Sequence, residues 1–251
     1  MTAGPVLAAR GLRKSFGGVR AVADVSFAVD AGEMLALIGP NGAGKSTCFN
    51  LLGGQLRPDA GRVELLGRDI GGLPPRAICR LGVGRTFQVT ETFASMTVRE
   101  NVQMALIAQA RRVWRFWRPA GREQAEAADR LLGQVGLAGQ EGRAAGVLAY
   151  GDLKRLDLAM ALARDPRLVL MDEPTAGMAP AERGALMQLV AELAHRRGLA
   201  VLFTEHDMDV VFSVADRILV LDRGTLIAAG AAEAIRGHPL VREVYLGAGA
   251  G

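Results

Sequence analysis

The segment GPNGAGKST, at residues 39–47, constrains the fold of this chain more than any other part of its sequence. It matches the pattern G-x-x-x-x-G-K-[S/T], it follows the apolar run MLALI, and it precedes CFNLLGG, which has helical character and ends in glycine. A glycine-rich loop between a strand and a helix is the context in which this pattern binds phosphate groups. The sequence therefore predicts an α/β domain with a phosphate-binding loop at the end of a buried strand.

Each part of this loop has a chemical reason. Its glycines let the backbone turn so that successive N–H groups face phosphate oxygens, and the helix that begins near Lys45 adds the partial positive charge of its N-terminus. Lys45 is expected to reach the β- and γ-phosphates, and the Ser46 hydroxyl is expected to bind Mg²⁺. The residues expected to contact the nucleotide are Gly39, Pro40, Asn41, Gly42, Ala43, Gly44, Lys45, Ser46 and Thr47.

The rest of the chain alternates strand-like and helical segments, which predicts parallel strands joined by helical crossovers. Half of the 251 residues are hydrophobic and 32 are glycine, as in globular α/β proteins. Residues 89–163 differ, because strand-like runs vanish there and Ala, Arg, Gln and Glu dominate. We expect a single three-layer domain over residues 6–246, with a core lobe of about residues 6–88 and 164–246 and an inserted helical lobe of about residues 89–163.

Charge, cysteine spacing and apolar runs indicate which ligands, metal sites and membrane segments to expect. The formal charge of +4 allows an anionic ligand or membrane headgroups without requiring nucleic acid. Cys48 and Cys79 have no metal-ligand spacing, so we expect reduced thiols that fill the core. The sequence has no uninterrupted apolar run of 18 residues and no signal-peptide pattern at its start, so we expect neither a transmembrane helix nor a secretion signal.

Polar residues follow several apolar runs that we expect to be strands. Proteins of the α/β class bind ligands at the carboxyl ends of their strands. The run LVLMDEP, residues 168–174, brings Asp172 and Glu173 to a strand end. Asp172 is expected to hold Mg²⁺ and Glu173 to polarise an attacking water. His206, in LFTEHDM, is expected to donate a hydrogen bond to the transferring phosphate oxygens. Gln88, in GRTFQVT, is expected to bind Mg²⁺ or water and to report the nucleotide state to the helical lobe.

The order of these motifs resembles that of the ATP-binding cassette (ABC) ATPases over roughly residues 6–246. The motifs are the phosphate loop, a glutamine before the helical lobe, the turn LAYGDLKR at residues 148–155, LVLMDEP, and a histidine after a strand. The resemblance implies a RecA-like, three-layer P-loop NTPase fold with an inserted α-helical subdomain. It also implies hydrolysis of ATP with Mg²⁺, coupled to transport through separate membrane subunits.

By this resemblance, LAYGDLKR is the family signature, which is commonly Leu-Ser-Gly-Gly-Gln. In the family, two ATPase chains face head to tail, and the signature of one covers the γ-phosphate that the other chain's phosphate loop holds. The corresponding residues here are Leu148, Ala149, Tyr150, Gly151 and Asp152. A glycine such as Gly151 permits close approach of the backbone to a phosphate, and the helix that follows aims its N–H groups at it.

This chain departs from the family pattern at several positions. Ala149 stands where Ser is common, and Tyr150 replaces the first glycine. Ala179 stands where Asp is common in the loop after the second carboxylate, which weakens the expected communication between the two sites. Lys154 and Arg155 either add positive charge near the signature or lie in solvent.

The resemblance also assigns a role to one aromatic residue. Phe16 aligns with the aromatic residue that stacks on adenine. The alternative for Phe16 is a core position on a strand.

Within the family, several segments look like the ATPases of branched-chain amino-acid importers: GVGRTFQ, MTVRENV, LAYG, EPTAGMAP and VREVYLG. The resemblance implies permease subunits, a second ATPase chain that is a paralogue or another copy, and an extracytoplasmic solute-binding protein as partners, with the chain peripheral on the cytoplasmic face of the inner membrane. A lipopolysaccharide-export ATPase is the nearer alternative. A cassette ATPase acting on DNA or ribosomes would need a coiled-coil insertion or a tandem cassette, and a P-loop kinase would leave LAYGDLKR and His206 unexplained.

The stretch QARRVWRFWRPAGR, residues 109–122, is basic and aromatic and contains no acidic residue. On a helix, Arg111, Arg115, Arg118 and, loosely, Arg122 form one stripe, and Pro119 is expected to end that helix. An arginine face in solvent is the favoured interpretation. The alternative is a helix near lipid headgroups or against a membrane partner.

Overall fold

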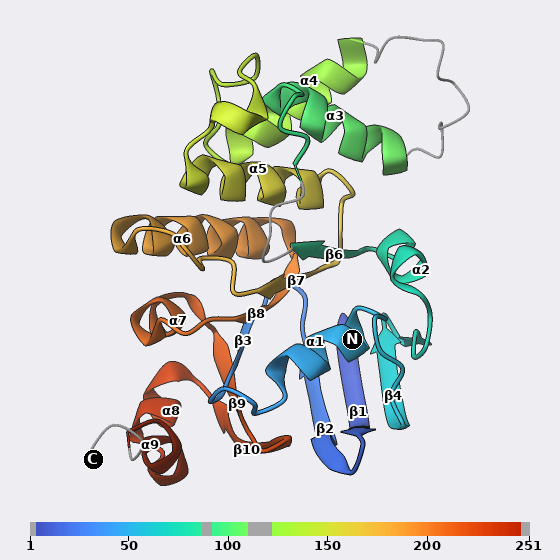
Figure 1. Cartoon of the computed structure of the whole chain (residues 1–251), viewed down its shortest axis with the longest axis vertical. Helices are drawn as coiled ribbons and strands as arrows, with labels where there is room; N and C mark the ends of the chain where they lie inside the picture. Colours follow the sequence, from blue (N-terminus) through green and yellow to red (C-terminus); the bar gives the residue numbers. More distant parts are fainter. Residues whose placement is uncertain (1–3, 87–91, 110–121, 247–251) are drawn as a thin grey trace.

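The computed structural model describes residues 4–86, 92–109 and 122–246, which form two sheets surrounded by helices (Figure 1). The larger sheet has six strands in the order β10-β9-β3-β8-β7-β6, and the smaller sheet has four in the order β2-β1-β4-β5. The strands of the larger sheet are β3 (Met34–Ile38), β6 (Val83–Thr86), β7 (Leu168–Asp172), β8 (Ala200–Thr204), β9 (Arg217–Asp222) and β10 (Thr225–Gly230). Those of the smaller sheet are β1 (Leu7–Phe16), β2 (Val19–Val29), β4 (Ala60–Leu65) and β5 (Arg68–Asp69).

The two sheets differ in strand direction. In the larger sheet, β3, β6, β7, β8 and β9 are parallel, and β10 runs antiparallel to β9. This confirms the parallel pairing expected from alternating strands and helices, and it brings the carboxyl ends of β3, β7 and β8 to one edge. The smaller sheet is antiparallel, with β1 and β2 as a long hairpin.

Alternate side chains of β3 divide the hydrophobic core in two. Leu35 and Leu37 pack with the smaller sheet and with α1 (Lys45–Leu52), whereas Met34, Ala36 and Ile38 pack with helices on the other face. A strand buried on both faces reads as the continuous apolar run MLALI. The result is the layered α/β arrangement that the motifs predicted.

The helices of that second core gather on one side of the larger sheet. Residues 92–162 contribute α3, α4 and α5, which lie together at the top of Figure 1. The bounds are α3 (Val98–Gln109), α4 (Arg122–Gln134), the short 3-10 helix η1 (Ala145–Val147) and α5 (Tyr150–Leu162). The other helices are α2 (Pro75–Arg80), α6 (Pro180–Arg197), α7 (Met208–Val214), α8 (Ala232–Gly237) and α9 (Pro239–Leu246). The division of the chain into lobes remains a prediction.

Two expectations about individual residues need correction or lie outside the structure. Cys48 is buried in α1, and burial raises the pKa of its thiol to about 12, so it is an inert core residue. Cys79 is only partly buried and contacts the Arg164 guanidinium, so the prediction of a core position for Cys79 was wrong. The arginine stripe of residues 111–118 lies outside the described residues.

None of the helices in the described ranges has the length and apolar character needed to cross a bilayer.

Candidate active site

The phosphate loop joins the end of β3 to the start of α1, and close backbone contacts require two of its glycines, Gly39 and Gly44. A methyl group at Gly39 would lie 2.2 Å from the carbonyl oxygen of Leu221, and one at Gly44 would lie 2.3 Å from that of Ala21. Gly44 is also left-handed, with φ 103°, and forms the N-cap of α1. Neighbouring strands therefore fix the loop from both sides, and α1 begins where the sequence predicted.

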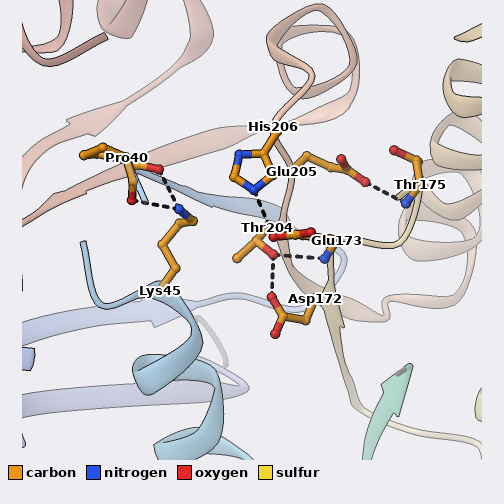
Figure 2. Close-up of polar contacts among 9 residues, drawn as sticks. Pro40, Lys45, Asp172, Glu173, Thr175, Thr204, Glu205 and His206 are labelled. Atoms are coloured by element: carbon orange, nitrogen blue, oxygen red, sulfur yellow. Dashed lines mark hydrogen bonds and ion pairs between the residues drawn. The ribbon is translucent and has the colours of Figure 1, made fainter. Parts of the chain in front are cut away.

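Helix α1 presents its N-terminus to this loop. Among the described residues no side chain caps it, and its first turn contains no acidic residue. The first N–H groups of a helix have no partner within the helix, so this end suits an anion. Lys45 is mostly buried, and its Nζ donates to the carbonyl oxygens of Gly39 at 2.6 Å and Pro40 at 3.1 Å (Figure 2). Burial lowers the pKa of Lys45, and the charges of Glu173 and Asp172 oppose that shift.

The two predicted carboxylates end β7 and point in different directions (Figure 2). Asp172 Oδ1 accepts a hydrogen bond from Thr204 Oγ1 at 2.8 Å, and Asp172 Oδ2 lies 4.0 Å from the Arg85 guanidinium. Glu173 adopts the left-handed conformation, with φ 50°. Such strain costs about 1–3 kcal/mol and is typical of functional sites. It turns the Glu173 carboxylate away from Asp172, so each carboxylate has its own surroundings.

Glu173 and His206 form a pair at the carboxyl edge of the sheet. His206 Nε2 lies 2.9 Å from Glu173 Oε1, and both side chains are partly exposed. Because β7 and β8 are parallel neighbours, the residues that follow them meet at the same edge. The sequence predicted this edge for both residues, and the structure brings them into contact.

Two neighbouring residues that the sequence argument missed organise this pair. Thr204, the buried last residue of β8, binds both Asp172 and Glu173: its Oγ1 donates to Asp172 and accepts from the Glu173 N–H at 3.0 Å. Buried Glu205 accepts from the Thr175 N–H at 2.8 Å, and burial raises the pKa of its carboxyl. The signal was present in LFTEH, where polar residues continue an apolar run, but only the histidine has an obvious role in catalysis.

A second helix N-terminus lies in the predicted signature. Leu148 is buried, Ala149 is the N-cap of α5, and Tyr150 and Gly151 open the helix. As at α1, no side chain in the described part of the chain caps this end. Asp152 Oδ2 accepts a hydrogen bond from Gln140 Nε2 at 3.2 Å.

The two basic residues that follow, Lys154 and Arg155, have different surroundings. Lys154 is buried with its Nζ 5.5 Å from the Tyr150 ring centre, so the solvent alternative was wrong for Lys154. Arg155 donates from Nη1 to the Val135 carbonyl at 3.0 Å. The Arg155 charge therefore lies against the end of α4, whereas the Lys154 charge lies beside the tyrosine of the signature.

The sequence itself places this arrangement in a family. Residues 22–176, which include the phosphate loop, the signature turn and Asp172 with Glu173, match the ABC transporter family. The chain belongs to the ABC transporter family. It is the ATP-binding subunit of a transporter, an ATPase whose activity is coupled to transport.

Relatives of this ABC subunit match it along nearly its whole length. It is 42% identical to the high-affinity branched-chain amino acid transport ATP-binding protein LivG of Salmonella typhimurium and 40% identical to BraF, which carries the same description, of Pseudomonas aeruginosa. Each comparison covers 97% of this chain and 98% of the relative.

Solved ABC cassettes have the same fold as this subunit. The ADP conformation of MJ1267, an ATP-binding cassette of an ABC transporter, superposes with a TM-score of 0.86 at 31% identity, over 97% of this chain and 99% of that one. A dimeric post-hydrolysis state of the cassette MJ0796 bound to ADP and Pi superposes with a TM-score of 0.76 at 25% identity, over 90% and 98%. These likenesses confirm the predicted RecA-like ABC fold.

Two further predicted residues of the nucleotide site are Phe16 and Gln88. Phe16 ends β1 and is 46% exposed with the Lys14 Nζ 5.6 Å from its ring centre, so the alternative of a core position was wrong. Its stacking on adenine remains a prediction. Gln88 lies outside the described residues.

Proposed function

We propose that this chain hydrolyses MgATP to power an importer of branched-chain or related amino acids. The observation that carries this proposal is the full-length similarity to LivG and BraF, together with the Glu173–His206 pair beside the phosphate loop. The similarity supports the class of solute. The pair supports the chemistry, because a carboxylate and an imidazole that share one sheet edge are suited to polarising a water and donating to phosphate oxygens.

Mg²⁺ suits the donors of this site. Ser46 in the first turn of α1 and Asp172 at the end of β7 offer a hydroxyl and a carboxylate, which are hard oxygen ligands, and Gln88 is the third ligand that the sequence predicts. Within the described ranges no three His, Cys, Asp or Glu side chains cluster as a metal cage. Mg²⁺ needs no such cage, since it keeps several waters and takes the rest of its ligands from substrate phosphates. When bound, the ion would neutralise developing phosphate charge.

The residues of the chain then divide the work of hydrolysis. The phosphate loop, residues 39–47, and Lys45 within it hold the phosphates. Glu173 orients and polarises the attacking water, and Thr204 fixes its backbone N–H. His206 donates to the transferring oxygens and positions Glu173 between turnovers. Phe16 stacks on adenine from the exposed end of β1.

The signature turn, residues 148–152, acts on a second ATPase chain. In this proposal two chains face head to tail, and the start of α5 covers the γ-phosphate held by the partner's phosphate loop. That partner is a paralogue or another copy. Membrane permeases bind the pair at the cytoplasmic face of the membrane, and an extracytoplasmic protein delivers the solute to them. The dimeric cassette MJ0796 supports the pairing of two cassettes.

The test is Glu173→Gln in the transporter reconstituted with its permeases, with ATP hydrolysis and leucine uptake measured together. The amide keeps the size of the side chain but is not a base, so we expect both rates to fall by about 10²–10⁴-fold. ATP binding to the subunit should persist. Glu205→Gln is the matched control, because it makes the same change on a buried side chain next to His206, and it should keep most of the turnover. Equal rates for Glu173→Gln and wild type would contradict the catalytic role, and hydrolysis without leucine uptake in the wild type would contradict the solute class.

A further inference from the structure

Tyr150, the first residue of α5, touches the loop that follows the catalytic carboxylate. Its Oη donates to the carbonyl oxygen of Ala176 at 3.1 Å. Ala176 in turn donates its N–H to the carbonyl oxygen of Glu173 at 3.1 Å. Two hydrogen bonds that share one residue therefore connect the signature turn to Glu173 of the same chain.

The tyrosine ring is held on two sides. A methyl group at Gly177 would lie 3.3 Å from ring atom Cε1, which is a tight contact, and the φ of +81° at Gly177 favours glycine. Lys154 lies on the next turn of α5 with its Nζ 5.5 Å from the ring centre. A buried ammonium at this distance attracts the ring, which fixes the direction of the hydroxyl.

The loop is also anchored at its other contacts. The Thr175 N–H donates to Glu205, and Arg183 donates from Nε to the Met178 carbonyl at 3.0 Å. Arg183 Nη1 reaches Asp207, the residue after His206, at 3.2 Å. The loop is therefore bound both to Glu173 and to the segment around His206. A displacement of α5 would move this loop and, with it, the Glu173 backbone.

We propose that Tyr150 is a positioning residue that couples the signature turn to Glu173 of its own chain through Ala176. This inference rests on the proposed function, in which the signature of this chain serves the partner's ATP while Glu173 serves its own. The state of one site then reaches the other through Tyr150. A glycine at position 150, as in the common signature, has no side chain for this bond, and Ala179 lacks the carboxylate common in the same loop.

The experiment isolates the site in which Tyr150 has no nucleotide contact. In an assembled transporter, the catalytic glutamate of the second ATPase chain is changed to glutamine, so the remaining turnover depends on Glu173. Tyr150→Phe, which removes one hydroxyl, is then introduced in this chain. We expect kcat to fall about 2- to 10-fold with KM for ATP unchanged, the loss that corresponds to one hydrogen bond.

A second readout uses the isolated subunit without nucleotide. Amide hydrogen exchange in residues 173–178 should be faster in Tyr150→Phe than in wild type. Tyr245→Phe is the matched control: it removes the chain's other tyrosine hydroxyl, from α9, which lies far from α5 in Figure 1. That variant should change neither readout.

Three outcomes overturn the inference. If kcat of the remaining site is unchanged in Tyr150→Phe, the tyrosine acts only at its own turn. If exchange in residues 173–178 is unchanged, the hydroxyl does not hold the loop. If Glu173→Gln in the same background leaves the remaining turnover intact, the proposed function fails and the inference fails with it, a result distinct from the other two.

Discussion

Helices α1 and α5 begin in the same way, yet different neighbours hold their first turns. Both lack a side-chain cap among the described residues, so both present N–H groups to an anion, but the first turn of α5 contains Asp152 and that of α1 contains no acidic residue. At α1 the glycines meet backbone carbonyls of β-strands, which cannot move independently. At α5 a methyl group on Gly151 would meet the end of a flexible side chain, the Glu182 carboxylate, at 3.2 Å.

The difference is that backbone atoms of neighbouring strands fix the start of α1, whereas side chains contribute to fixing the start of α5. Side chains take part in holding the start of α5: Tyr150 donates to Ala176, and the Glu182 carboxylate lies beside Gly151. In the proposed function, such a turn can shift as two ATPase chains approach each other.

The same substitution at the two helix starts should therefore have very different effects. Gly44→Ala forces a methyl group against the Ala21 carbonyl at a left-handed φ, and we expect it to cost about 2–4 kcal/mol of the free energy of unfolding. It should also abolish the ATP-dependent rise in melting temperature.

Gly151→Ala should change the free energy of unfolding by less than about 1 kcal/mol, because Glu182 can turn aside and alanine favours a helix. Chemical unfolding and thermal shifts with ATP measure both variants. Equal losses at positions 44 and 151 would break the comparison.

A smaller effect is expected at Glu205, which accepts a hydrogen bond from Thr175 in the loop that follows Glu173. Burial raises the pKa of the Glu205 carboxyl, so the folded state favours its protonated form. Stability from this group is present below the ordinary pKa of 4.5 and is lost as pH rises through the raised pKa. Glu205→Gln keeps an oxygen for the Thr175 N–H without the charge, so its melting temperature should exceed that of wild type by about 1–3 °C at pH 8.

This advantage of Glu205→Gln should shrink toward pH 4.5. Melting curves between pH 4.5 and 8 give the comparison. A difference that stays constant over that range would show that the buried charge does not decide the stability of this loop.

Sequence reasoning located the parts of this site that a regular pattern encodes. The apolar run before Gly39 and the run before Asp172 each mark the end of a strand, and the structure places both ends as expected. Their positions after apolar runs predicted that Glu173 and His206 lie at the same sheet edge, and the structure adds the contact between them.

Contacts that depend on side-chain direction could not be read in this way. Thr204 bridges Asp172 and Glu173 only because β7 and β8 are in one register. Lys154 is buried beside the Tyr150 ring, and Tyr150 reaches a loop 26 residues away. No local pattern encodes these distances, because they arise from how the helices pack on the sheet.

The central claim is that the start of α5 serves a nucleotide bound by another chain. Gly151→Asp tests it most directly, because the added carboxylate would meet both Glu182 and the partner's γ-phosphate, while the phosphate loop of its own chain is unchanged. Gly151→Asn, of equal size without the charge, separates repulsion from bulk and should lose less activity.

The decisive measurement is ATP hydrolysis by assembled transporters that contain Gly151→Asp alone, Lys45→Ala alone, or one chain of each. If both ATPase chains are copies of this one, each single variant damages both composite sites and should be inactive. In the mixed pair both lesions then fall in one composite site and the other site is whole, so we expect partial activity to return. If the second ATPase is a paralogue, Gly151→Asp in this chain and the change at the paralogue's phosphate-loop lysine fall in the same composite site, so the double variant should be no less active than either single variant. Wild-type hydrolysis by the transporter that contains Gly151→Asp alone would contradict the claim and reduce LAYGDLKR to a turn that begins a helix.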